Sequence, residues 1–316
     1  MKKVFRYLLY TFLVIVVIVA GLAAIIAFRG IPKFKADAVN LKVEVTPARV
    51  VRGQKLASML CAECHMDPST GKLTGRLMND VPQFGVIYSK NITRDLGAGI
   101  GNWSDGQLAY LLRTGLKPDG TFLPLMAKLS HTSDEDVASI IAYLRSEHPW
   151  VAPDKKVQPA SDYSFLAKFL TNASLIKPSG YPAHPIAEPD TANAVQWGRY
   201  IALAQLECYS CHSLDFAKND YEQPEKSAGF FGGGNKFALP EGGERYSRNI
   251  TMDEATGIGK WSEDDFVKAV RYNRRPDGQL LRKPMPSYGN LSDAEARAIF
   301  AYLKTIPKIH NQVERK

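Results

Sequence analysis

The first apolar feature of the chain is an uninterrupted run from Tyr7 to Phe28, in which 22 consecutive residues carry no charge. At about 1.5 Å per residue, a helix of this length spans about 33 Å, which matches the hydrocarbon core of a bilayer. The run is too long for the apolar part of an ordinary cleaved signal. Residues 1–28 are therefore predicted to form an uncleaved signal anchor, with cleavage near the small residues of 20–27 as the alternative.

Beyond this run, apolar residues recur at helical spacing, and no run of alternating apolar and polar residues predicts a sheet. Two helices are predicted at about 47–60 and 192–207. Further helices are predicted to begin at serines that are followed three residues later by Gln, Asp or Glu, as in a capping box. These serines are Ser104, Ser133, Ser262 and Ser292. The pattern predicts an all-α fold.

Several short motifs recur at a constant spacing. Asn91-Ile92-Thr93 recurs as Asn249-Ile250-Thr251, an offset of 158 residues, and the motifs Gly-Ile-Gly-x-Trp-Ser and Pro-Asp-Gly keep the same offset. Residues 129–144 match residues 288–303 at an offset of 159. Such self-similarity is typical of a duplicated structural unit. Each copy has roughly 100 residues, which is enough for one modest hydrophobic core.

All four cysteines lie in two C-x-x-C-H motifs, one in each copy. This is the attachment signature of a c-type haem. Two thiols at this spacing can form thioethers to the two vinyl groups of one porphyrin, while the imidazole of the next residue reaches the iron. The motifs predict two covalently bound haem c groups, and the residues that would hold them are Cys61, Cys64, His65, Cys208, Cys211 and His212.

Other uses of paired cysteines fit less well. Zinc ribbons usually separate their two pairs by about 15 to 20 residues, and the gap here is far longer. A thioredoxin-like redox pair would lie beside a βαβ unit and would not need the histidine. Disulfides within each motif would close only very small loops. Covalent haem is therefore the favoured interpretation.

Only two methionines occupy corresponding positions in the two copies, Met126 and Met285. Both have neighbouring prolines, which keep a loop extended and remove backbone donors from an apolar pocket. We therefore predict them as the sixth ligands of the two irons. Gap-filling core side chains are the alternative, and His131 is a candidate to replace Met126. His/Met ligation fills both axial positions and raises the reduction potential, which favours one-electron transfer over catalysis at the metal.

Two further repeated features have structural interpretations. Trp103 and Trp261 precede predicted helices, where a tryptophan is usually a packing anchor, although an indole N–H directed at a haem propionate is the alternative. The repeated Asn-Ile-Thr motif is expected to form a turn or to line the haem.

The predicted organisation is therefore two tandem cytochrome c domains, each a small helical fold around a covalent haem, preceded by one transmembrane helix. The anchor covers 1–28, a linker 29–46, the first domain 47–148, a proline-rich connector 149–190 and the second domain 191–310. Because the connector carries an aromatic patch at residues 165–170, it is expected to be ordered along both domains.

The charge of the chain changes this picture little. The formal net charge is +8, and leaving out Lys2, Lys3 and Arg6 before the anchor reduces it to +5. Two haems would add roughly four ionised propionates, so the exposed part is nearly neutral and nucleic-acid binding is not expected. Haem attachment in bacteria takes place outside the cytoplasmic membrane. The domains are therefore expected on the periplasmic side of the inner membrane, held by a single span.

Together, the proline-flanked methionine, the repeated Asn-Ile-Thr, Gly-Ile-Gly-x-Trp-Ser and Pro-Asp-Gly motifs and the Ala-Tyr-Leu ending resemble a known family. It is that of the membrane-associated cytochrome c subunits of bacterial alcohol, aldehyde, gluconate and nicotinate dehydrogenases. The resemblance covers about residues 47–148 and 191–307. This chain has two haem motifs where three are common, and it is anchored through its N-terminus.

The resemblance implies an electron carrier and not an enzyme. Its electron donor would be a periplasmic or membrane dehydrogenase or a quinol oxidoreductase, and its acceptor an oxidase or another cytochrome. The chief alternative is a dihaem peroxidase with one displaceable axial ligand, which the matched methionines disfavour. A sensing module is a third class, and no signalling domain in this sequence points to it.

Overall fold

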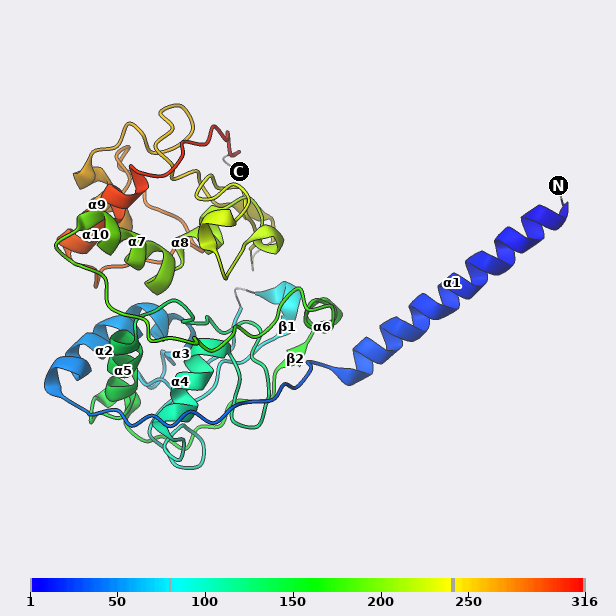
Figure 1. Cartoon of the computed structure of the whole chain (residues 1–316), viewed down its shortest axis with the longest axis horizontal. Coiled ribbons are helices and arrows are strands. Elements are labelled where there is room, and N and C mark those ends of the chain that lie inside the picture. Colours follow the sequence, from blue (N-terminus) through cyan, green and yellow to red (C-terminus); the bar gives the residue numbers. More distant parts are fainter. Residues whose placement is uncertain (1, 80, 240–241, 315–316) are drawn as a thin grey trace.

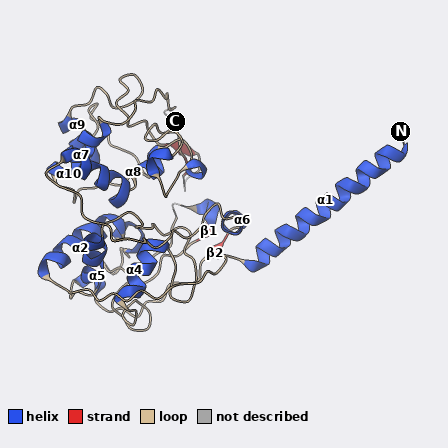
Figure 2. Cartoon of the chain, viewed as in Figure 1, coloured by secondary structure: helices blue, strands red, loops and turns tan. Residues whose placement is uncertain are grey.

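The computed structural model describes residues 2–79, 81–239 and 242–314. Figure 1 shows two lobes, one above the other, and a long helix that projects away from them. This helix, α1 (Lys2–Arg29), is long and apolar enough to cross a membrane, and its side chains are almost entirely exposed. Among the described residues helices are the main regular element, as predicted, strands are few and short, and long loops join the helices (Figure 2).

The first lobe forms around a close crossing of two helices, α2 (Pro47–Leu60) and α5 (Asp134–Leu144). Gly53 lies at the crossing, where a Cβ atom would come within 1.9 Å of the carbonyl oxygen of Ser139. The short α3 (Ala62–His65) and α4 (Asp105–Thr114) complete the helices of this lobe. Its buried core includes Leu56, Ala57, Leu112, Ile140, Ile141 and Tyr143.

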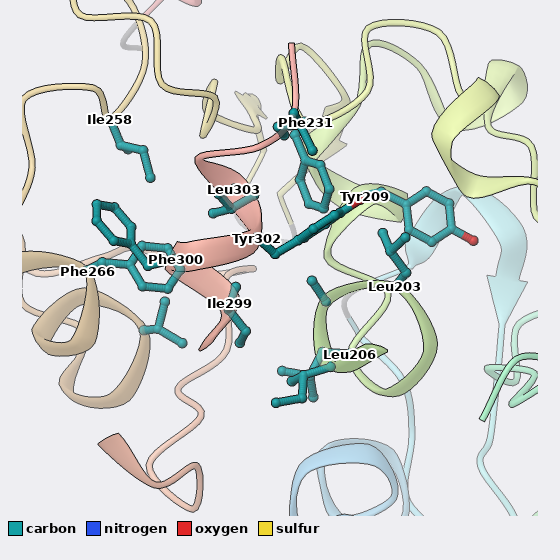
Figure 3. Packing of buried hydrophobic residues seen from close by; sticks show 14 of the residues in the cluster. Leu203, Leu206, Tyr209, Phe231, Ile258, Phe266, Ile299, Phe300, Tyr302 and Leu303 are labelled. Carbon is teal, nitrogen blue, oxygen red and sulfur yellow. The ribbon is translucent and has the colours of Figure 1, made fainter. Parts of the chain in front are cut away.

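The second lobe repeats this arrangement. Its helices are α7 (Ala194–Tyr200), α8 (Cys208–His212), α9 (Glu263–Tyr272) and α10 (Asp293–Leu303). A Cβ atom on Gly198 would come within 1.8 Å of the carbonyl oxygen of Ala298, so α7 crosses α10 as closely as α2 crosses α5. Figure 3 shows its core, with buried side chains that include Leu203, Tyr209, Phe231, Phe266, Phe300 and Tyr302.

Three of the predicted serine caps are complete capping boxes. Ser104, Ser262 and Ser292 each accept a hydrogen bond from the backbone three residues on, and the side chain at that position bonds back. Ser133 also caps its helix, α5. The carboxylate of Asp136, three residues later, is directed instead to the other lobe.

The helix predicted over about 192–207 is present from Ala194 to Gln205, but its last turn is not α-helical. The α-helix stops at Tyr200 and continues as a π-helical turn, η3 (Ile201–Gln205), after which Glu207 has a left-handed φ of 45°. The cause is an insertion, because Cys208 comes ten positions after Gly198, whereas Cys61 comes eight positions after the corresponding Gly53. A π-helical turn is a common way to fit extra residues into a helix.

The remaining elements are short. Two antiparallel pairs of strands are present among the described residues, β1 (Gly85–Val86) with β2 (Asp162–Tyr163) and β3 (Lys236–Ala238) with β4 (Glu244–Tyr246). The connector contains α6 (Phe165–Asn172). Single helical turns are η1 (Pro82–Phe84), η2 (Pro149–Val151), η4 (Phe216–Lys218) and η5 (Pro224–Lys226).

The segments outside the lobes are ordered against them. Residues 31–39 lie along the first lobe, where the ring of Phe34 packs edge-on against Phe122 at 5.7 Å between centroids. The connector pairs with the first lobe through Lys156 and Asp67, at 2.5 Å between Nζ and Oδ2. Its Lys177 pairs with Glu222 of the second lobe at 3.6 Å, so the connector contacts both lobes, as predicted.

A polar network joins the two lobes directly. The buried carboxylate of Asp136 in the first lobe accepts hydrogen bonds from Tyr200 Oη at 2.5 Å and Gln205 Nε2 at 2.7 Å. The hydroxyl of Thr132 donates to the carbonyl oxygen of Ala204 at 2.7 Å. Since Met59 also packs against both cores, the lobes form a continuous body.

Candidate haem sites

Each C-x-x-C-H motif forms one helical turn. In the first motif the N–H of His65 donates to the carbonyl oxygen of Cys61 at 2.8 Å, and α3 covers the rest of the turn. Side chains three and four residues apart share a helix face, so both thiols and the imidazole point to one side. The second motif is the short helix α8. None of the four cysteines forms a disulfide.

Both predicted ligand histidines are oriented by the same backbone contact. His65 Nδ1 lies 2.6 Å from the carbonyl oxygen of Lys90, and His212 Nδ1 lies 2.8 Å from that of Arg248. With the proton on Nδ1, each ring keeps Nε2 as a lone-pair donor, which is the form that binds a metal. Burial lowers the pKa of both imidazoles and so favours this neutral form.

The residue just before the repeated Asn-Ile-Thr motif supplies the accepting carbonyl, Lys90 in the first copy and Arg248 in the second. In the first copy the N–H of Thr93 donates to Asn91 Oδ1 at 2.9 Å, and the second copy has the same bond from Thr251 to Asn249 at 2.9 Å. The predicted turn is therefore confirmed in both copies. Its function in the fold is to hold the carbonyl that orients the histidine.

The two predicted methionine ligands lie in equivalent loops. The N–H of Met126 donates to the carbonyl oxygen of Leu123 at 3.2 Å, and that of Met285 donates to Arg282 at the same distance. Met126 is half-buried and packs against the first core together with Cys61. Met285 is also half-buried, but it is not among the described residues that pack on the second core. The structure thus brings Met126, but not Met285, into its lobe's core cluster.

An arginine fixes the loop after each methionine. Arg113 is buried, and its guanidinium donates to the carbonyl oxygen of Leu129 at 2.7 Å and to Asp134 at 2.6 Å. In the second lobe Arg271, 158 residues later, pairs with Asp293 and contacts the carbonyl oxygen of Gly289 at 3.4 Å. These contacts link the methionine loop to the start of the last helix in each lobe.

The donor set of each lobe fits a covalent haem better than a metal ion alone. Two thiols in one turn, a neutral imidazole and a bordering apolar core supply the attachment, the ligand and the surroundings that a porphyrin needs. Burial raises the pKa of the Cys61 and Cys208 thiols to about 12. Among the described residues, no three His, Cys, Asp or Glu side chains converge as a metal site would require.

His131, the alternative to Met126 as an iron ligand, and the two repeated tryptophans make contacts elsewhere in the protein. His131 Nε2 lies 2.7 Å from the carbonyl oxygen of Tyr221 in the other lobe, where it contributes to the junction. Trp103 packs against the first core and Trp261 against the second. Their expected role as packing anchors is confirmed, and an indole contact to a haem propionate stays a prediction.

Curated relatives match most of the chain. A fructose dehydrogenase cytochrome subunit from Gluconobacter japonicus is 31% identical over 281 residues, covering 84% of this chain and 55% of that protein. A gluconate 2-dehydrogenase cytochrome c subunit from Pantoea cypripedii is 29% identical, covering 83% and 60%. A diheme cytochrome c-type protein from Cereibacter sphaeroides is 30% identical, covering 79% of this chain and 82% of that protein.

The chain belongs to the c-type cytochrome family. No protein-family model matches it. This cytochrome spans somewhat more than half the length of the two dehydrogenase subunits and most of the length of the dihaem relative. The relationship implies covalently bound haem c and a general role in electron transfer. It confirms the resemblance inferred from the motifs.

Sequence reasoning missed several residues that support the sites of this cytochrome. Arg113 and Arg271 keep the 158-residue offset, so the repeat itself was a usable signal. The close-packed glycines Gly53 and Gly198 could not be matched in the sequence, because the insertion before Cys208 changes the distance from the glycine to the haem motif in the second copy. The carbonyl oxygens that orient the histidines carry no sequence signal of their own, since any residue can supply one.

Proposed function

We propose that this protein is a membrane-tethered dihaem cytochrome c that relays single electrons. Each lobe would be one cytochrome c domain, 47–148 and 191–310, with one haem attached through its two cysteines. The axial ligands would be His65 with Met126 in the first domain and His212 with Met285 in the second. The dihaem relative, which spans a similar length, supports the count of two.

The observation that carries this proposal is the duplicated histidine contact. In both lobes the imidazole of the C-x-x-C-H motif hydrogen-bonds through Nδ1 to a backbone carbonyl that a repeated Asn-x-Thr turn holds in place. One such contact would be unremarkable. Here the contact occurs twice, and its acceptors Lys90 and Arg248 lie 158 residues apart, at equivalent positions of the repeat. This supports two sites that each present an oriented imidazole to an iron.

Haem iron supplies a centre that changes charge by one electron, and the side chains of this chain determine its surroundings. The carbonyl of Lys90 holds the proton of His65 on Nδ1 and increases the basicity of the ring. The buried cores exclude water from one side of each site, so few solvent molecules reorganise when the charge changes. A thioether ligand from Met126 or Met285 would leave no position for substrate.

The partners follow from the relatives and from the first helix. Because similar cytochromes are named as subunits of fructose and gluconate dehydrogenases, we infer a dehydrogenase or quinol oxidoreductase as the donor and an oxidase or another carrier as the acceptor. The anchor α1 would span the inner membrane with both lobes on the periplasmic side, where haem is attached.

Expression in a host competent for cytochrome maturation tests the cofactor. The purified full-length protein is expected to be coloured, to exceed the polypeptide mass by two haems and to keep both after denaturation. The variant Cys208→Ala/Cys211→Ala is expected to lose one haem and keep the other. A colourless protein with the bare polypeptide mass would contradict the proposal.

The axial ligands are tested by Met126→Ala and Met285→Ala. Each variant is expected to keep both haems attached, to lose one methionine-to-iron charge-transfer band and to lower the reduction potential of one haem, because a thioether ligand raises it. Exogenous imidazole should then bind at that site. Met252→Ala is the control, because Met252 is buried but aligns with Arg94 in the other copy. Unchanged spectra and potentials in Met285→Ala would show that Met285 is not a ligand. High peroxidase activity of the unaltered protein would favour the alternative function, a dihaem peroxidase.

A further inference from the structure

The connector helix α6 exposes an apolar face. Phe165, Leu166 and Phe169 are 50%, 44% and 42% exposed, and they fall within an arc of about 100° on the helix. Leu175, just after the helix, is 67% exposed. The opposite face of α6 carries its two buried side chains, Ala167 and Thr171. Apolar side chains that gather on one face in this way mark a surface that contacts something other than water.

This helix packs against the end of α1. The amide of Asn172 donates to the carbonyl oxygen of Gly30 at 2.9 Å, and the two helices are in contact (Figure 1). In the last turns of α1, only Ala23 and Ile26 are partly covered among side chains that are otherwise exposed. Ile26 precedes Arg29 by three residues, or about 4.5 Å along a helix. α6 therefore lies at the level where the apolar segment of α1 ends.

Basic residues lie near this region in the sequence, and two of them, Lys35 and Lys177, also pair with the exposed carboxylates of Asp37 and Glu222. Arg29, Lys33 and Lys35 follow the apolar segment of α1. Lys168 is in α6, and Lys177 follows it. A helix with an apolar face, flanked by Lys and Arg, has the composition of a helix that lies in the plane of a membrane interface.

We propose that α6 and Leu175 rest in the outer interface of the lipid bilayer, beside the point where α1 leaves it. This inference rests on the proposed function in one respect, because it requires α1 to be an uncleaved anchor. Continuity with α1 favours lipid as the occupant, since any protein docking on α6 would compete with the bilayer that surrounds the neighbouring helix. The first lobe would then contact the membrane through both α1 and α6. Two contacts would fix the orientation of the lobe relative to the membrane as well as its distance from it.

Spin labelling of the full-length, haem-loaded protein in phospholipid vesicles tests the proposal. Since both haems occupy all four native cysteines, Phe169→Cys introduces a single reactive thiol. The matched control is Leu280→Cys, because Leu280 is 63% exposed on the second lobe. Collisions of each label with oxygen, which concentrates in lipid, and with a water-soluble nickel chelate are measured by power saturation.

We expect the ratio of oxygen to chelate accessibility to be about threefold or more higher at position 169 than at position 280, as for a side chain in the interface. Leu166→Cys should give the same result and guards against a local defect at position 169. Equal access of the chelate to positions 169 and 280 would overturn the inference. Exclusion of both reagents from position 169 would also overturn it, in favour of a protein partner or a second copy.

Two controls separate this inference from the proposed function. Uptake of label by the unaltered protein would mean that the cysteines are not occupied by haem, which contradicts the proposed cofactor. An N-terminus beginning after residue 29, together with release from membranes in carbonate, would overturn the anchor and the inference together. With α1 and both haems retained, a label in water at position 169 overturns the inference alone.

Discussion

One ion pair shows how single residues stabilise the first lobe. Arg49 in α2 donates through Nε and Nη2 to the two carboxylate oxygens of Glu135 in α5, at 2.8 Å each. The hydrogen bond from Arg49 lowers the pKa of Glu135, and burial opposes the shift. Because both side chains are about one-third exposed, water screens the pair and its contribution is modest.

This pair predicts a specific pH dependence of stability. A carboxylate with a lowered folded-state pKa stabilises the fold above its unfolded value, about 4.3 for glutamate, and loses that contribution as the pH falls through the folded value. Glu135→Gln is therefore expected to reduce the free energy of unfolding by up to about 1 kcal/mol at pH 7. The difference should vanish toward pH 3 in urea titrations followed by circular dichroism. Glu147→Gln is the control, because Glu147 also pairs with an arginine, Arg94, but its side chain is 87% exposed, so that water screens this pair almost completely. A loss of unfolding free energy that stayed constant with pH would show that it does not come from the ionised Glu135–Arg49 pair.

At the level of elements, the helix crossing in each lobe depends on a glycine. A Cβ atom at residue 53 or 198 would overlap a backbone carbonyl oxygen, which cannot turn aside as a side chain can. The two helices would have to separate. Their separation would open the core that borders the haem motif, since Leu56 and Ala57 lie between Gly53 and Cys61.

Gly53→Ala is therefore expected to destabilise the protein by about 1–3 kcal/mol or more, through overpacking. Urea denaturation of the haem-loaded protein measures the loss. Gly180→Ala is the matched control, because a Cβ atom there meets nothing within 4 Å. A stability equal to that of the unaltered protein would mean that the crossing tolerates a methyl group.

The elements also show what sequence patterns can and cannot predict. Helix starts were predictable from local chemistry, since Ser104 and Ser292 satisfy their own backbone donors within four residues. The π-helical turn at Ile201–Gln205 was not predictable in this way. It arises because Gly198, which packs against α10, and Cys208, which begins the haem motif, are farther apart in the sequence than their counterparts in the first lobe. The C-x-x-C-H motifs identified the site residues for the same local reason, whereas Arg113 acts through contacts 16 to 21 residues away.

At the level of the whole molecule, the junction determines how the two lobes face one another. Tyr200 is central to it, because its hydroxyl donates to Asp136 at 2.5 Å and accepts from the N–H of Ser133 at 2.8 Å. Burial, and secondly the carboxylate of Asp136, raise the pKa of Tyr200, so the hydroxyl keeps its proton at neutral pH. If each lobe holds a haem, this contact helps to fix the distance over which an electron passes between them.

Tyr200→Phe tests whether the junction couples the lobes. The variant keeps the ring but leaves the N–H of Ser133 and the Asp136 carboxylate each short of one partner, which costs about 1–3 kcal/mol. We expect faster hydrogen exchange in residues 129–136 and 201–206, and two separated unfolding transitions in place of one, by mass spectrometry and calorimetry. Tyr246→Phe removes a hydroxyl that donates to Glu244 on the surface of the second lobe, away from the junction, and should change neither. If both variants behaved alike, the lobes would be held by the apolar contacts of Met59 and by the connector, and their spacing would not depend on this network.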